Sequence, residues 1–159
     1  MKIWQMEQYP CGDRRLPHHM FPPKIYTTDQ LTSLTGIITY KVDIDDINAM
    51  KKRISRVKAE RKVISSDILT LHGKIADFEQ KLAQFYEPVT KDVDSIFFVL
   101  EGSAYYDVEV EEDSWIRINV ERGDLIIIPR GRSYRFTVTP QNAVTIQRFY
   151  QAKNKTQQG

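Results

Sequence analysis

The residue types best able to bind a metal or transfer a proton are few in this chain and widely separated. Its histidines are His18, His19 and His72, and the stretch DVD holds two carboxylates, Asp92 and Asp94. Side chains two apart on a strand point the same way, so these aspartates could chelate a cation together. A solvated strand edge or turn is the more ordinary role for such a pair. Adjacent histidines on an extended chain point apart, so we expect His18 and His19 to be structural and His72 to be a surface residue.

Other catalytic arrangements are not indicated. Cys11 is the only cysteine, and it lies in a proline-rich loop without an evident histidine partner. Ser103 and Ser133 lack a triad pattern, and no Gly-rich phosphate loop is present. Glu121 and Asp124 lie in the stretch ERGD, where turn residues are expected. The sequence therefore predicts neither nucleophilic catalysis nor nucleotide binding.

Three zones of the chain would position these residues. Residues 1–26 contain four prolines and are predicted to be irregular, because proline is incompatible with a helix interior. The pattern T-x-x-Q from Thr27 to Gln30 predicts a capping box for a short helix that Gly36 ends. The alternation in GIITYKVD, residues 36–43, then predicts a strand.

The two later zones have different periodicities. Residues 45–86 are predicted to be helical, with a basic face exposed to solvent, because apolar residues recur at helical spacing. Residues 89–150 contain short apolar segments separated by the turn signals LEGS, EEDS, ERGD and PRGR, which predicts a β-barrel or sandwich. Residues 151–159 are polar and are predicted to be a disordered tail.

Length and composition restrict the function classes. The 159 residues suggest one domain, 1–159, that can bury a core without disulfides. A net charge of +2 gives no argument for nucleic-acid binding. No signal peptide and no 18-residue apolar stretch is found, so no membrane span is expected. The single cysteine favours a reducing compartment.

The spacing of turn residues in the third zone resembles the cupin superfamily. GDLIIIPRGRSYRF places Gly123, Pro129, Gly131 and Tyr134 in the second cupin motif, G-x5-P-x-G-x2-H, with tyrosine in place of histidine. The positions of the first motif, H-x-H-x3-E-x6-G, are found by counting back from Gly102, which matches its final glycine. The resemblance implies a mainly β fold with some α, a double-stranded β-helix barrel with N-terminal helices packed outside. The glycines and the proline would form turns.

Seven ordered blocks narrow the resemblance to the acireductone dioxygenase family over residues 3–150. They are IWQME, RRLPHH, FYEP, LEGSAYYDV, DSWIRI, ERGDLIIIP and YRFTV. The family acts in methionine salvage and uses Fe(II) or nickel held by three histidines and one glutamate. The first-motif count and the second motif put those four positions at Val89, Lys91, Ser95 and Tyr134. A family arginine just after the glutamate is replaced here by Phe97.

These replacements remove the donors that such a metal needs. Iron and nickel bind imidazole nitrogen or carboxylate oxygen. Val89 has no donor atom, and the ammonium of Lys91 has no lone pair and repels a cation. Ser95 is a weak neutral ligand, and Tyr134 alone cannot hold a divalent ion. We therefore expect no metal cofactor. If the strand is regular, Lys91 would face the barrel interior together with Val89.

The resemblance and the lost ligands together predict an inactive acireductone dioxygenase homologue with a non-catalytic binding or regulatory role. Two alternatives stay open: an active enzyme with unconventional ligands drawn from Tyr134, Asp92 and Asp94, and a metal-free barrel that binds a small ligand. Neither nucleic acid nor a membrane is expected as a partner, and a protein partner is left open. The family in eukaryotes is cytoplasmic and nuclear, which implies the same location here.

Overall fold

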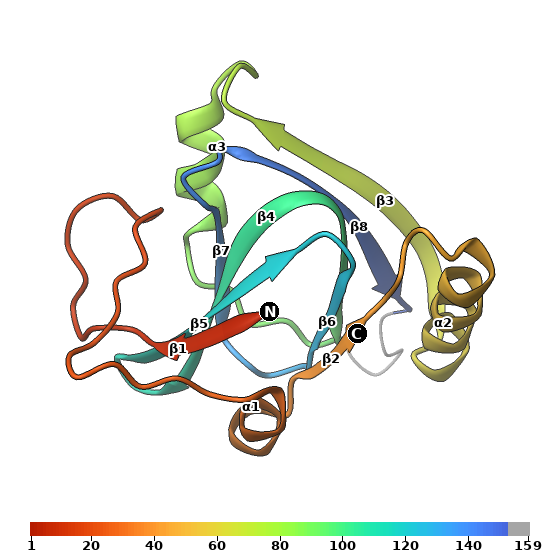
Figure 1. Cartoon of the computed structure of the whole chain (residues 1–159), viewed down its shortest axis with the longest axis horizontal. Coiled ribbons are helices and arrows are strands. Elements are labelled where there is room, and N and C mark those ends of the chain that lie inside the picture. The colour runs from red at the N-terminus through yellow and green to blue at the C-terminus, as the bar shows by residue number, and fades with distance from the viewer. Residues whose placement is uncertain (153–159) are drawn as a thin grey trace, which may run out of the picture.

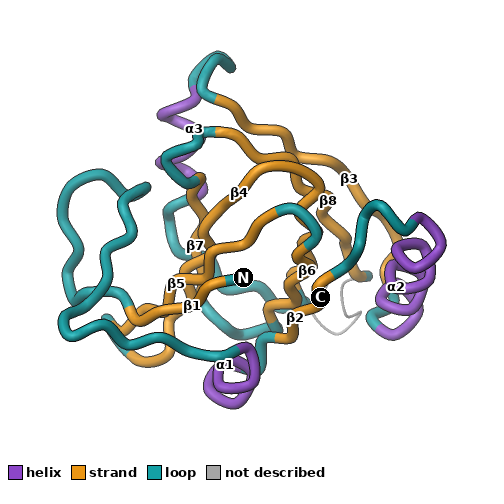
Figure 2. Tube along the Cα trace, in the orientation of Figure 1, coloured by secondary structure: helices purple, strands orange, loops and turns teal. Residues whose placement is uncertain are grey.

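The structure is a computed structural model and describes residues 1–152; residues 153–159 of the predicted tail lie outside the described part. A curled, eight-stranded antiparallel sheet forms a barrel, and the three helices lie on its outside (Figures 1 and 2). In chain order the elements are β1 (Lys2–Gln5), α1 (Thr28–Thr35), β2 (Ile38–Lys41), α2 (Ile47–Glu60), β3 (Val63–His72), α3 (Phe78–Phe85), β4 (Ser95–Glu111), β5 (Ser114–Glu121), β6 (Asp124–Ile128), β7 (Tyr134–Val138) and β8 (Ala143–Gln151).

The long strand β4 belongs to both halves of the barrel. Its first part pairs with β6 and β8, and its second part pairs with β5 and β7. We predicted two strands separated by a turn at LEGS, and this was wrong, because β4 continues through a register shift between Val99 and Glu101. Gly102 makes this possible: its φ is 78°, and a Cβ there would overlap the carbonyl oxygen of Ala143 on β8.

The register shift changes which side chains of β4 face the barrel interior. Before it, Phe97 and Val99 pack inside, while Phe98 packs outside against a second apolar cluster. After it, Ala104 and Tyr106 pack inside. The side-chain period of a strand is two, so without the extra residue the second half of β4 would point its other face inward.

The helical prediction for residues 45–86 is confirmed for α2 and α3 and wrong for β3. Strand β3 pairs with β8 from Val63 to His72, including Ile68 opposite Gln147. The three-residue spacing of Ile68 and Leu71 fits a helix by periodicity, but Leu71 is buried and Ile68 is exposed in a strand. Pairing with β8 over this length determines the conformation of residues 63–72. The local spacing of apolar residues does not reveal this pairing.

Three further local predictions, for α1, the N-terminal residues and the C-terminal tail, have different outcomes. The capping box between Thr27 and Gln30 is present, and Gly36 ends α1 in the left-handed conformation, as predicted. Residues 2–5, which we predicted to be irregular, form β1 and pair with β5. At the other end, Gln151 belongs to β8 and its amide donates to the carbonyl oxygen of Arg61, so the predicted tail does not begin at this residue.

Apolar packing occurs on both sides of the barrel wall. The interior cluster includes Tyr106, Ile126 and Phe136. The outer cluster lies beneath α2, where Val57 packs with Ile96 and other side chains of the sheet. The opposite face of α2 carries the exposed basic residues predicted for it: Lys51, Lys52, Arg56 and Lys58.

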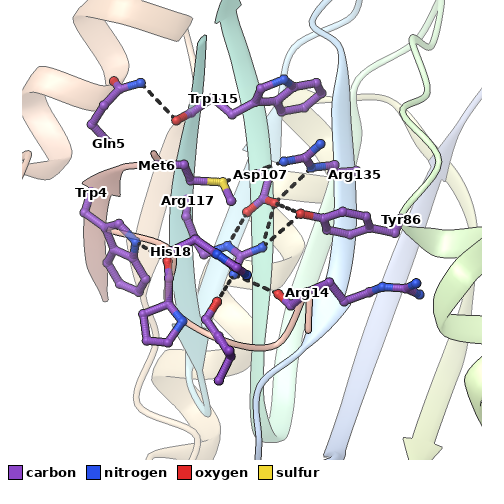
Figure 3. Close-up of polar contacts among 12 residues, drawn as sticks. Trp4, Gln5, Met6, Arg14, His18, Tyr86, Asp107, Trp115, Arg117 and Arg135 are labelled. Atoms are coloured by element: carbon purple, nitrogen blue, oxygen red, sulfur yellow. Dashed lines mark hydrogen bonds and ion pairs between the residues drawn. The ribbon is translucent and has the colours of Figure 1, made fainter. Parts of the chain in front are cut away.

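A buried ionic network lies on the outer face of the sheet, opposite the interior core. Asp107 of β4 is 1% exposed and accepts hydrogen bonds from Arg117 Nε at 2.7 Å and Arg135 Nε at 3.0 Å. The Tyr86 hydroxyl also donates to it, at 3.2 Å (Figure 3). Burial, helped by the Asp107 charge, raises the pKa of Tyr86 to about 12, so this hydroxyl remains a donor at neutral pH.

The same network attaches the N-terminal segment to the barrel. Arg117 is fully buried and donates through Nη1 to the carbonyl oxygens of Arg14 and Leu16. The Arg135 guanidinium lies over the rings of Tyr86 and Trp115, 4.3 and 4.1 Å from their centroids. These contacts satisfy buried charges while they hold a loop that has little regular structure of its own.

Replacing the shared carboxylate should therefore destabilise the fold strongly. We expect Asp107→Asn to lower the free energy of unfolding by about 3–5 kcal/mol, because it leaves Arg117 buried without a counter-charge. Urea denaturation measures this. Asp67→Asn is a matched control, since its carboxylate also meets an arginine but is 45% exposed, and an exposed pair contributes about 0–1 kcal/mol. Equal effects of the two substitutions would contradict the structural role of the network.

Candidate functional site

A cavity of about 950 Å³ opens at one end of the barrel, between β3 and β8 on one side and β7 and α3 on the other. Its walls are mainly apolar, and charged side chains lie at its mouth. The lining side chains come from β3 (Ile64, Leu69), α3 (Gln84, Phe85), the connection to β4 (Glu87, Val89, Lys91, Asp92, Val93, Asp94), β4 (Ser95, Ile96, Phe97, Tyr106), β7 (Tyr134, Phe136) and β8 with the next residue (Arg148, Phe149, Tyr150, Gln151, Ala152).

Two of the four positions that resemble metal ligands now bond to each other. Ser95 begins β4 and Tyr134 begins β7, and their hydroxyl oxygens lie 2.9 Å apart. Ser95 is 9% exposed and Tyr134 is 8% exposed. Burial raises the pKa of Tyr134, which opposes the lowering by its hydrogen bond with Ser95 and by the Arg148 charge. The phenol is therefore protonated at neutral pH and is not a phenolate ligand.

Val89 lies beside Tyr134, at the edge of β7 that does not pair with β4. It forms an isolated antiparallel bridge with Tyr134, in which the two amides donate to the opposite carbonyl oxygens at 2.9 and 3.0 Å. Val89 is 37% exposed and lines the cavity. Val89, Ser95 and Tyr134 thus lie close together in the structure, where they present an alkyl group and two hydroxyls.

Lys91 does not follow the predicted geometry. The chain bends at residues 92 and 93 and is not a regular strand between Val89 and Ser95. Lys91 is exposed at the cavity mouth, and its carbonyl oxygen accepts from the amide of Gly131 at 2.9 Å. The prediction that Lys91 faces the interior was therefore wrong. Its ammonium avoids the cost of leaving water.

The two aspartates of DVD do not act as a chelating pair. Asp92 is exposed in the bend. The Asp94 carboxylate accepts from Arg61 at 3.1 Å and from the backbone amide of Arg130 at 3.0 Å. Asp94 is partly buried, with 18% of its side chain exposed, so it is a connector between loops and not the solvated edge that we predicted.

Phe97, in the place of the family arginine, forms part of an aromatic floor. Its ring stacks on Tyr106 at 4.8 Å and meets the edge of Tyr134 at 6.1 Å. Phe136 packs against both Tyr106 and Phe85, with centroid distances of 5.1 and 5.5 Å. Burial raises the pKa of Tyr106 well above its ordinary value. The floor of the cavity is thus aromatic and uncharged.

Sequence reasoning missed one charged group of the cavity wall, Arg148. It lies opposite Phe97 in the register of β4 and β8, and its guanidinium donates to both oxygens of Asp67 on β3, at 2.9 and 2.8 Å. The Tyr150 hydroxyl donates to the same carboxylate at 2.9 Å. This pairing holds the pKa of Asp67 below its usual value. Asp67 fell within the segment predicted to be helical, so no signal connected it with β8.

The histidines take structural positions outside the cavity. The ring of His19 stacks on Trp4 at 4.4 Å, and His18 Nδ1 lies 3.2 Å from Glu7. His72 ends β3, and its Nδ1 accepts from the backbone amide of Lys74 at 3.2 Å. Within residues 1–152, no three or more His, Cys, Asp or Glu side chains are grouped so that they could hold a metal ion.

The residues at the four positions do not fit Fe(II) or nickel. Both ions need several nitrogen or carboxylate donors, and this site offers two protonated hydroxyls and an alkyl group. Of the two carboxylates adjacent in sequence to these positions, Asp94 is held by Arg61 and Asp92 is exposed in a bend. Gly123 and Gly131, with φ of 94° and 83°, lie in turns before β6 and β7, and the Gly131 amide donates to the carbonyl oxygen of Lys91. Across residues 1–152, none of the helices is long and apolar enough to cross a membrane.

The chain is similar in sequence to acireductone dioxygenases over nearly its whole length. Residues 2–158 match the ARD/ARD' family. The chain is 57% identical, over the full length of both proteins, to "Probable inactive acireductone dioxygenase 1" of Caenorhabditis elegans. It is 34% identical to the human acireductone dioxygenase, over 94% of this chain and 83% of that protein.

The fold also agrees with a solved structure. An acireductone dioxygenase from Bacillus anthracis, with a cadmium ion in its active center, superposes with a TM-score of 0.69 at 18% identity and covers 77% of this chain and 82% of that one. The predicted cupin barrel is confirmed by this likeness. The match over nearly the whole sequence shows that this chain belongs to the ARD/ARD' family of acireductone dioxygenases.

Proposed function

We propose that this chain is a catalytically inactive acireductone dioxygenase homologue whose barrel cavity serves, without a metal, as a binding site with a non-catalytic role. The hydrogen bond between Ser95 and Tyr134 carries the proposal, because it joins two positions that the motif spacing aligns with metal ligands of the family. The names of the relatives at 57% and 45% identity, which describe probable inactive acireductone dioxygenases, support it. From the family we also propose a connection with methionine salvage and a location in the cytoplasm and nucleus.

The hydroxyl pair opposes metal binding for a physical reason. A tyrosine binds iron as a phenolate, which requires loss of its proton. Burial raises the pKa of Tyr134, so forming the phenolate in this cavity is disfavoured. A divalent ion would also have to break the bond to Ser95 and would gain only neutral oxygen donors. Lys91 at the mouth adds a positive charge that repels the ion.

The same cavity keeps the properties of a small-molecule site. Its volume of about 950 Å³ lies within the range of about 300–1,000 Å³ that is usual for ligand pockets. Apolar and aromatic side chains line its floor, with a few polar groups above them. Such a lining buries ligand surface by the hydrophobic effect and needs no metal. A protein partner that modulates or uses this cavity is compatible with the proposal.

An active enzyme with unconventional ligands is the alternative to this function. It would need Asp92 and Asp94 together with Tyr134. Asp94 already binds Arg61 and the Arg130 amide, and Asp92 is exposed in a bend. Recruiting them would break an ion pair and rearrange the connection into β4. The geometry favours the inactive protein.

Metal content measured together with oxygen consumption separates the two functions. We expect protein purified from iron- and nickel-supplemented medium to contain neither metal in stoichiometric amount, and to consume no oxygen with an acireductone and Fe(II). A chelator should leave the melting temperature unchanged, since no fold-stabilising ion is removed. Oxygen uptake that depends on the protein, or a fall of several degrees with chelator, would contradict the inactive function.

Rebuilding the ligand set tests whether these positions still form a metal frame. We expect the variant Val89→His, Lys91→His, Ser95→Glu and Tyr134→His to bind Fe(II) or nickel, because positions 89, 95 and 134 already converge in the barrel. Equilibrium dialysis measures the affinity. Adding Phe97→Arg should raise any residual turnover, since an anionic acireductone then gains a charge partner.

A matched control isolates the carboxylate of the rebuilt site. The same variant with Ser95→Gln in place of Ser95→Glu keeps the side-chain size and removes the charged ligand, so its metal affinity should be lower by at least about tenfold. A rebuilt variant that folds, as shown by circular dichroism, and takes up no more metal than the unmodified protein would show that the four positions are not the family's ligand frame.

A further inference from the structure

The Ser95 and Tyr134 hydroxyls carry two hydrogens, and the hydrogen bond between them uses only one. Each hydroxyl carries one O–H donor, and only one of the two is needed for the 2.9 Å contact. Among the described residues, neither oxygen has another hydrogen-bond partner. Both groups are at least nine-tenths buried, and both line the cavity. A buried donor without an acceptor is costly, so this position favours a ligand that supplies an acceptor.

The charges around the cavity do not favour an anionic ligand. Arg148, the cation of its wall, already donates to both oxygens of Asp67. Asp94 is paired with Arg61. Lys91 is exposed at the mouth, beside acidic side chains that are also exposed. An anion placed beside the hydroxyl pair would lose its hydration, and Lys91, which forms no ion pair among the described residues, is exposed at the mouth, where water and salt screen its charge.

The aromatic floor favours a planar apolar group. Phe97 stacks on Tyr106, and Tyr106 packs against Phe136. Tyr134 meets the edge of Phe97, so the floor and the hydroxyl pair are adjacent. A ring lying on this floor would bring a short substituent toward the free O–H. Aromatic pairs in offset or edge-to-face arrangements contribute beyond the apolar area that they bury.

We propose that the cavity binds an uncharged, planar apolar molecule whose carbonyl oxygen accepts a hydrogen bond from the Ser95–Tyr134 hydroxyl pair. The proposal rests on the proposed function, in which the barrel is a binding site and not a metal centre. It names the chemical class of the ligand: neutral, with an aromatic or similarly flat body and one carbonyl group. The negatively charged acireductone that the family cleaves falls outside this class.

Three naphthalene derivatives that differ in one substituent test the proposal. 2-Acetylnaphthalene is neutral and carries an acceptor, 2-ethylnaphthalene is neutral without one, and 2-naphthoate is an anion. Equilibrium dialysis against the unmodified protein gives the three dissociation constants. We expect the acetyl compound to bind about fivefold more tightly than the ethyl compound, which is the usual effect of one net hydrogen bond. The carboxylate should bind most weakly.

Variants then identify the donor. In Ser95→Ala/Tyr134→Phe both hydroxyls are absent, so the acetyl and ethyl compounds should bind equally, while the ethyl compound binds as it does to the unmodified protein. Each single substitution leaves one hydroxyl and should retain part of the preference for the acetyl compound. Ser103→Ala is the matched control, because Ser103 belongs to another buried hydroxyl pair, with Thr139 at 2.7 Å, that does not line the cavity. It should retain the full preference.

The outcomes separate a failure of the proposed ligand class from a failure of the proposed binding function. If no naphthalene compound binds, both the metal-free binding site and its ligand class are wrong. If 2-naphthoate binds most tightly, or if the double variant keeps the preference for the acetyl compound, the cavity is a binding site but the class is wrong. If the double variant does not fold, the two single variants and the comparison of the three compounds on the unmodified protein decide the proposal.

Discussion

The pairing of β4 with four other strands is the constraint on which the barrel depends. One continuous strand can serve both halves only if it bends closely against β8, and Gly102 permits this because a side chain there would overlap the Ala143 carbonyl. The accompanying register shift brings Phe97 and Tyr106 to the same interior, where they stack. Without that shift Asp107 would face the apolar core, at a large desolvation cost. The cavity floor and the buried ionic network are thus consequences of a single bend.

The polar groups of the protein are separated by the barrel wall. Of the fully buried charged side chains, Asp107 and Arg117 lie on the outer face beneath the N-terminal segment, where each has several partners, and Asp124 pairs with Lys41. In the interior, Ser95 and Tyr134 are neutral and bond to each other. An enzyme of this family concentrates metal charge and ligand charge inside the barrel. In this chain the hydroxyl pair and the aromatic residues beside it are uncharged, and the fold is held by apolar packing and by an ionic network on the outer face of the sheet.

The sequence predicts those features whose causes are local. Spacing within a motif put Gly123 at the turn before β6 and Tyr134 at the cavity, and the capping box at Thr27 depends on residues three apart. The missed features arise from distant pairing or from small departures from regular geometry. Strand β3 forms because it pairs with β8, and Asp67 reaches Arg148 across 81 residues of sequence. The chain bends at residues 92 and 93, so the alternation of side chains along a regular strand did not give the direction of Lys91.

The central claim is that a protonated hydroxyl pair has replaced the metal at this site, and Tyr134 reports on it most directly. In protein with isotopically labelled tyrosine rings, nuclear magnetic resonance can follow each tyrosine as paramagnetic Ni²⁺ is added. The account predicts that the Tyr134 signals persist unchanged in position and width at several equivalents of nickel, as do those of Tyr105 on the outer face of the sheet. Selective broadening or loss of the Tyr134 signals at one equivalent would contradict it, because it would place the ion beside this ring.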